Sequence, residues 1–124
     1  CNRRLHGTIK PPFRLAEGKT VEELHAAVSL FCETQAPVTI PEMQLRKLGR
    51  FIALVPAQPD RALSELAAAV VAAFDPFRAP LNEAELAKRR KSKLSERQEA
   101  LLQRWGYPYV MDELRFHITL SGAL

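Results

Sequence analysis

The two ends of this 124-residue chain carry the same alternating pattern. Residues 4–10 read RLHGTIK and residues 115–121 read RFHITLS, so Arg, His and Thr recur in register. Because strand side chains alternate between two faces, each segment would place its polar residues on one face and its apolar residues on the other. We therefore expect strands near both ends of the chain, each with a chemically active face and a core face.

Between these segments, four helix signals surround one hairpin signal. The helices are predicted over about 21–34, from Pro59 to the Asp75-Pro76 stop, from the Asn82 cap, and from the Ser95 cap to Gly106. The apolar stretches 38–48 and 51–55 predict an antiparallel hairpin, whose first strand starts late or lies at an edge because of Pro41. The fold class is therefore α+β, in a single domain over residues 1–124.

Composition and charge narrow the classes of function. The longest apolar run, residues 66–74, is too short to span a bilayer, and no signal peptide opens the chain, which predicts a cytoplasmic protein. Two cysteines are too few for a disulfide framework or a zinc site, so we expect no metal and no cofactor. The formal net charge of +4 favours anionic ligands. The chain begins with Cys1 and not with methionine, so we expect it to be a fragment.

The paired segments suit displacement at phosphorus. His6 and His117 could act as general acid and base near neutral pH, in either assignment, and Thr8 and Thr119 could donate to the nonbridging oxygens. The alternative is that these are ordinary strand residues, with threonine chosen for its β-propensity. β-propensity alone does not explain why arginine, histidine and threonine recur in register. We therefore predict that His6, Thr8, His117 and Thr119 are catalytic.

Neighbouring residues are candidates for substrate binding. Lys10 continues the active face of the first strand and could bind a phosphate or face solvent. Arg115, which we favour over Arg4, could clamp a phosphate or lie at the rim of the cleft. Tyr107 and Tyr109 could stack on a nucleobase or pack on the core.

Three other features are read as structural. Residues 88–93 read KRRKSK and are typical of a solvated helix face. His25 lies on or beside the apolar stripe of the predicted helix 21–34. Trp105 comes at a helix end, where it is expected to pack on the core.

The two His-x-Thr motifs, at residues 6–8 and 117–119, resemble those of the two-histidine (2H) phosphoesterase superfamily. Segments 6–15, 75–81 and 104–110 are similar to those of a branch encoded among phosphonate-utilisation genes. The resemblance implies two pseudo-symmetric lobes of antiparallel sheet with helices packed outside, and a central cleft for one phosphate-bearing substrate. It also implies further strands on both sides of this chain. The chain departs from the pattern just before His6, where an aromatic residue is expected.

Two functions follow from this interpretation. The first is a metal-independent phosphodiesterase, a hydrolase that acts on a cyclic phosphate or small phosphodiester, such as a cyclic nucleotide or sugar phosphate, and is linked to phosphonate metabolism. The alternative is a non-catalytic module that binds a nucleotide or an RNA end in the same cleft, with residues 88–93 contacting the backbone. The natural substrate and the oligomeric state are left open.

Overall fold

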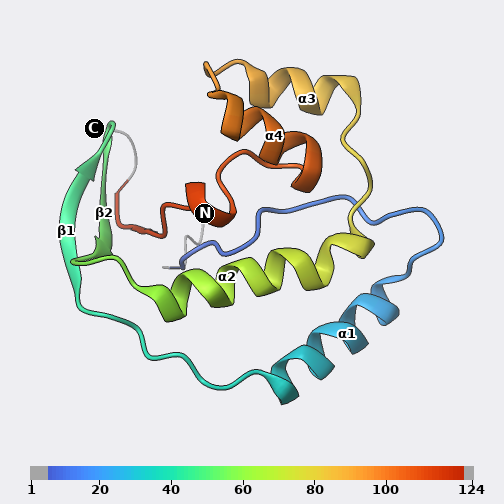
Figure 1. Cartoon of the computed structure of the whole chain (residues 1–124), viewed down its shortest axis with the longest axis horizontal. Coiled ribbons are helices and arrows are strands. Elements are labelled where there is room, and N and C mark those ends of the chain that lie inside the picture. Colours follow the sequence, from blue (N-terminus) through green and yellow to red (C-terminus); the bar gives the residue numbers. More distant parts are fainter. Residues whose placement is uncertain (1–5, 122–124) are drawn as a thin grey trace.

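Four α-helices and a three-stranded antiparallel sheet make up the part of the chain that the computed structural model describes, residues 6–121 (Figure 1). The α+β prediction is confirmed at this level. In chain order the elements are α1 (Val21–Thr34), β1 (Met43–Leu48), β2 (Phe51–Pro56), α2 (Arg61–Phe74), the 3-10 turn η1 (Asp75–Phe77), α3 (Glu83–Arg90), α4 (Glu96–Trp105), the 3-10 turn η2 (Met111–Glu113) and β3 (Ile118–Thr119). Within residues 6–121, no helix is long and apolar enough to cross a membrane.

The sheet has the order β1-β2-β3, with both pairs antiparallel. β1 and β2 form the predicted hairpin, closed by the Leu48–Phe51 pair around Gly49, whose φ of 58° is in the left-handed region. β1 is an edge strand and begins only at Met43, as the proline at position 41 predicts.

Side-chain caps set the helix ends where the sequence predicts them. Asn82 and Glu85 form a capping box at the start of α3, and Ser95 and Gln98 form one at the start of α4. Gly106 ends α4 in the left-handed conformation with φ 80°. α3 ends at residue 90, so the basic run extends past the helix.

The core forms around α2. One stripe of α2 is buried, and Val71 on it clusters with Leu101 of α4 and with Val110. Figure 1 shows α2 between α1 on one side and the α3/α4 pair on the other, with the hairpin at one end of the molecule. α1 buries no residue and meets α2 through the Phe31 and Phe74 rings, whose centroids are 5.4 Å apart. α2 is therefore the element on which the other helices depend.

The strands predicted at the two ends are shorter than expected. Residues 1–5 lie outside the described residues, and from the first segment only Gly7 pairs with the sheet, in an isolated bridge to Ile118. The second segment contributes only the two residues of β3, which pair with Ala53 and Leu54 of β2, and beyond them the amide of Leu120 donates to the carbonyl of Ile52 at 2.8 Å. Residues 6–121 contain one sheet, and the two-lobed arrangement stays a prediction.

Replacing Leu102 by alanine should destabilise the fold strongly. Leu102 is 1% exposed, so the truncation leaves a cavity beside α2 and should lower the free energy of unfolding by about 2–5 kcal/mol. The matched control is Leu30→Ala in α1, where the side chain is 62% exposed and the change should stay within about 0.5 kcal/mol. Urea denaturation measures both values, and equal losses would contradict the assignment of the core.

Candidate functional site

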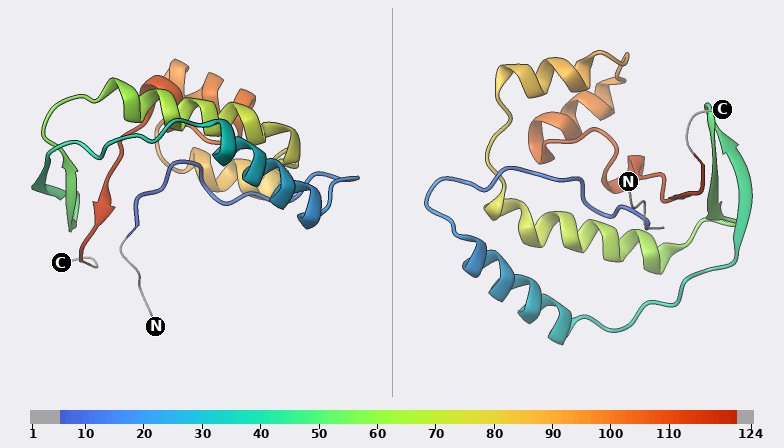
Figure 2. Two further views of the ribbon diagram at one scale, coloured as in Figure 1. Left: turned by 90° about the horizontal axis from the view of Figure 1, so that it is seen from below. Right: turned by 180° about the vertical axis from the view of Figure 1, so that it is seen from behind.

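An antiparallel bridge between Gly7 and Ile118 brings the two His-x-Thr segments side by side, as Figure 2 shows for the first described residues and β3. In an antiparallel pair the residues on either side of a bridge face each other. His6 therefore lies opposite Thr119, and His117 lies opposite Thr8. Because neighbours in a strand alternate faces, all four residues share one face of the sheet. We call these four residues the histidine–threonine cluster.

A hydrogen bond orients the ring of His117. Its Nδ1 lies 2.8 Å from the carbonyl oxygen of Arg115, and a carbonyl can only accept. Nδ1 therefore carries the hydrogen, and the neutral imidazole presents an unprotonated Nε2. The ring of Phe51 lies beside it, with centroids 6.1 Å apart. His117 thus has one ring nitrogen held by its own chain.

Gly7 allows the ring of Phe116 to lie directly over the bridge. A Cβ at this position would lie 2.4 Å from Cζ of Phe116, so no other residue fits without a shift of that ring. In the sequence, Gly7 is notable only as the middle residue of the first His-x-Thr motif. The close approach of Phe116 is what makes glycine necessary there.

The opposite face of the sheet carries the apolar residues that the sequence assigns to a core. In the two segments, Ile9, Phe116 and Ile118 are half-buried and Leu120 is 39% exposed. On the same face of β1 and β2, Leu45 is 67% exposed and Ile52 is 36% exposed. The segments alternate as predicted, but nothing within residues 6–121 covers this face fully. The expectation of a buried core face is corrected in this respect.

Of the predicted binding residues, Lys10 and Arg115 are held by backbone carbonyls. Lys10 reaches α2, where its Nζ donates to the carbonyl of Val71 at 3.4 Å, and it lies 5.3 Å from the ring centroid of Phe13. Burial lowers the pKa of Lys10, with opposing effects from nearby charges. Arg115 is exposed and donates to the carbonyl of Leu114 at 3.3 Å.

Tyr107 and Tyr109 pack against each other after α4, with an edge-to-face contact of 5.5 Å between centroids. The guanidinium of Arg89 lies 4.7 Å from the Tyr107 centroid, and Tyr107 also packs on the core cluster. Trp105 packs on the same cluster, as predicted. These contacts tie the tyrosines to α3 and α4, whereas the histidine–threonine cluster lies on the sheet.

The three segments that carry the family resemblance converge on one another. Residues 15 and 78 form an antiparallel bridge, and the amide of Ala79 donates to the carbonyl of Arg14 at 2.7 Å. Arg78 reaches the third segment, donating to the carbonyl of Arg104 at 3.4 Å, and forms an ion pair of 3.0 Å with Asp75. The sequence alone does not predict that Arg14, Arg78 and Arg104 come together, because they lie far apart in the chain.

A cavity of about 130 Å³ lies where these segments meet. Five cationic side chains and one carboxylate line it, together with Trp105 and Gly106. We call it the basic pocket, and its charged residues are Lys10, Arg14, Arg78, Glu85, Lys88 and Arg89. The sequence analysis named Lys10 as a candidate, and it named Lys88 and Arg89 only within the basic run 88–93 of the alternative function. It did not name Arg14, Arg78 or Glu85.

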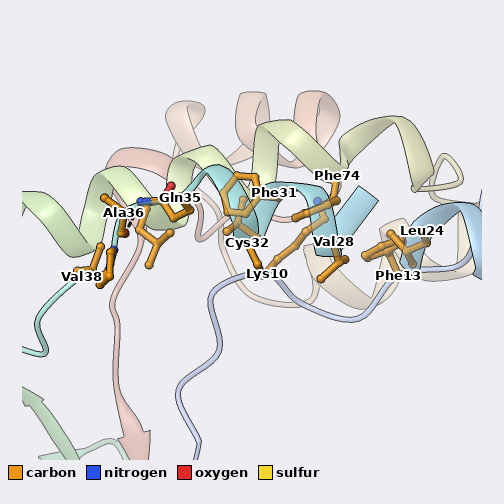
Figure 3. A pocket seen from close by; sticks show the side chains of 13 residues that line it. Lys10, Phe13, Leu24, Val28, Phe31, Cys32, Gln35, Ala36, Val38 and Phe74 are labelled. Atoms are coloured by element: carbon orange, nitrogen blue, oxygen red, sulfur yellow. Dashed lines mark hydrogen bonds between the residues drawn. The ribbon is translucent and has the colours of Figure 1, made fainter. Parts of the chain in front are cut away.

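A larger groove of about 570 Å³ runs between α1 and α2 (Figure 3). Its lining is apolar, with the rings of Phe13, Phe31 and Phe74, and Lys10 is its one charged residue. Free Cys32 also lines it. A lining of this kind suits apolar groups rather than a phosphate. Within residues 6–121, no group of three or more His, Cys, Asp or Glu side chains could hold a metal ion.

The fold and the cluster define the chain as an α+β domain in which two His-x-Thr segments lie side by side. It belongs to the family described as "Protein of unknown function (DUF1045)", whose match covers residues 8–124. No solved structure matches the chain.

Two curated relatives carry the name ribose 1,5-bisphosphate phosphokinase PhnN. The protein of Janthinobacterium sp. (strain Marseille) is 48% identical over 119 residues, which is 96% of this chain and 26% of the relative. The protein of Laribacter hongkongensis (strain HLHK9) is 36% identical over 126 residues, which is 96% of this chain and 27% of the relative. The chain therefore spans about a quarter of the length of these relatives. The family match and the relatives tie it to phosphonate-utilisation genes, but they do not show membership in the 2H superfamily.

The prediction of a phosphodiesterase is wrong. The relatives are named as a phosphokinase, which transfers a phosphoryl group to an acceptor, whereas a phosphodiesterase is a hydrolase and transfers it to water. The expectation of a hydrolase that acts on a cyclic phosphate is wrong for the same reason. The alternative, a nucleotide or RNA-end binding module, is supported no better. The expectation of a phosphate-bearing small molecule is compatible with the relatives' name.

Residues 18–20 read GKT, the last three residues of the glycine-rich loop that holds nucleotide phosphates in many kinases. The first glycine of that loop would fall at position 13, which is Phe13. Here Thr20 caps α1 by accepting from the amide of Glu23. Lys19 lies 5.2 Å from the ring centroid of Phe77. This segment therefore serves as a helix cap.

Gly106→Ala should destabilise the protein more than Gly18→Ala. Both glycines have a left-handed φ, 80° and 83°, so alanine costs roughly 1–2 kcal/mol of backbone strain at either place. A Cβ at position 106 would also lie 2.6 Å from Nη1 of Arg78 and would push the guanidinium away from Asp75. Losing that charged hydrogen bond lowers the free energy of unfolding by a further amount of about 1.5–3 kcal/mol. A Cβ at position 18 meets no atom within 4 Å. Equal losses in urea denaturation would show that Arg78 is not fixed by these contacts.

Glu85→Gln should flatten the fall of stability in acid. The hydrogen bonds from Arg14, at 2.7 Å, and from the Asn82 backbone lower the pKa of Glu85 from 4.5 to about 2. A lowered carboxyl pKa stabilises the fold above pH 4.5, and this contribution is lost as the pH falls toward 2. Glutamine keeps the helix cap but does not titrate. Thermal unfolding from pH 2 to 6 measures the effect.

The control for this comparison is Glu65→Gln. Its ion pair with Arg61 is exposed on both sides, at 65% and 92%. Such pairs contribute little, so this variant should follow the wild type in acid. A wild-type acid profile for Glu85→Gln would contradict the assigned role of the pair.

Proposed function

We propose that this chain is part of an enzyme of phosphonate metabolism and that its histidine–threonine cluster binds a phosphoryl group of a phosphorylated ribose. The observation that carries the proposal is the Gly7–Ile118 bridge, whose register sets His6 against Thr119 and His117 against Thr8. The relatives' name supports the class of substrate. The finer features, a 2H-like fold of two lobes within a single domain, belong to the same proposal.

The chemistry of the four side chains fits this role. Threonine hydroxyls and a protonated imidazole donate hydrogen bonds to phosphoryl oxygens, and bonds to a charged acceptor are the stronger ones. Neutral His117, with Nδ1 bound to the Arg115 carbonyl, can accept a hydrogen bond from a sugar hydroxyl through Nε2. The cluster therefore combines donors for the phosphate with an acceptor for the sugar.

Arg115 is proposed to lie at the rim of this site, because its exposed guanidinium stands two residues before His117. Its charge would attract a phosphate before the cluster binds it. Tyr107 and Tyr109 stay a prediction, and their contacts with Arg89 and with each other supply no support for a role at the cluster. In a longer protein such as the relatives, this quarter would hold the ribose phosphate and the rest would contribute to phosphoryl transfer.

His6→Ala and His117→Ala should each weaken binding of ribose 1,5-bisphosphate about tenfold or more, since each removes a hydrogen bond to a charged ligand. Isothermal titration calorimetry measures the dissociation constants. The control is His25→Ala, which removes the third histidine, exposed on α1, and should change binding less than twofold. Tight binding that neither cluster variant weakens would contradict the proposal, and so would no binding by the wild type.

A further inference from the structure

The basic pocket concentrates the positive charge of the chain. Its five cationic side chains and one carboxylate leave a net charge of +4, equal to the formal net charge of the whole chain. The one carboxylate, Glu85, is bound by Arg14 through contacts of 2.7 to 3.2 Å. Among residues 6–121, Lys10, Lys88 and Arg89 form no ion pair, although the charge of Asp75 acts on Lys10 and the charge of Arg89 acts on Glu85.

The walls of the pocket are fixed before any ligand binds. Arg78 is held by Asp75 and by the carbonyls of Ala79 and Arg104, and its side chain is 13% exposed. Gly106 leaves room for it, and Arg89 lies against Tyr107. Donors held in this way lose little conformational entropy on binding a ligand.

We propose that the basic pocket binds the phosphoryl group of a small phosphate ester, at a place separate from the histidine–threonine cluster. A cavity of about 130 Å³ is well below the roughly 300–1,000 Å³ of a pocket for a whole drug-sized ligand, so it suits a single anionic group. Lysine and arginine together are the side chains that recognise phosphate. A bound dianion would relieve the repulsion among the five cations, which share one carboxylate in the lining of the pocket. The inference does not depend on the role of the histidines.

The test uses the single tryptophan of the chain, Trp105, which lines the pocket. The full chain is titrated with inorganic phosphate, with ribose 5-phosphate and with ribose, while the fluorescence of Trp105 is followed. Both phosphates should change the fluorescence with saturation, and ribose should not. A response to ribose 5-phosphate that is stronger than the response to phosphate would assign the ester as the preferred source of the phosphoryl group.

Paired charge removals locate the site. Lys88→Gln with Arg89→Gln should raise the dissociation constant for phosphate at least about tenfold. Lys91→Gln with Lys93→Gln removes the same charge just past α3, where neither residue lines the pocket, and should change it less than twofold. Glu85→Gln removes the carboxylate and should tighten binding. If the first double variant does not fold, exposed Lys88→Gln is compared with Lys91→Gln instead.

Three results would overturn the inference. The first is no saturable response of the wild type to either phosphate. The second is an equal loss in both double variants, which would mean general electrostatic attraction. The third is a loss in His6→Ala and His117→Ala but not in the pocket variant, which would place the ion at the cluster and leave the proposed function intact. If only the pocket variant loses phosphate binding and the cluster variants bind ribose 1,5-bisphosphate like the wild type, the inference stands and the proposed function is wrong. The two proposals are therefore distinguishable.

Discussion

The antiparallel pairing of Gly7 with Ile118 is the contact on which the candidate site depends. It joins segments 111 positions apart and fixes which histidine faces which threonine. The pairing relies on a glycine beneath the ring of Phe116 and on the backbone of β2, which pairs with Ile118 from the other side. Without this bridge the four polar side chains would share no face.

The second constraint is the convergence of three segments beside α2. Residues 14–16 and 77–79 pair through their backbones, and Arg78 links them to the end of α4. The same contacts hold cationic side chains around one cavity. Packing and the proposed binding of phosphate therefore rest on the same residues. A substitution such as Gly106→Ala would affect both.

Local signals in the sequence were sufficient for the helices and the hairpin. Caps at Asn82, Ser95 and Gly106 act within a few residues, so their effect can be predicted without the tertiary fold. The basic pocket could not be predicted, because Arg14 and Arg78 are brought together only by long-range pairing. The type of reaction could not be predicted either. Acid–base residues and hydroxyl donors suit phosphoryl transfer to water and to another acceptor alike, and only the relatives' name separated the two.

The central claim is that both histidines of the cluster bind the same phosphorylated ribose. Because the chain has three histidines, its imidazole NMR spectrum has few signals, and His25 on α1 serves as an internal reference. Titration with ribose 1,5-bisphosphate should shift the ring signals of His6 and His117 together, at one dissociation constant, while those of His25 stay in place. Movement of only one of the two, or of all three alike, would contradict a shared site.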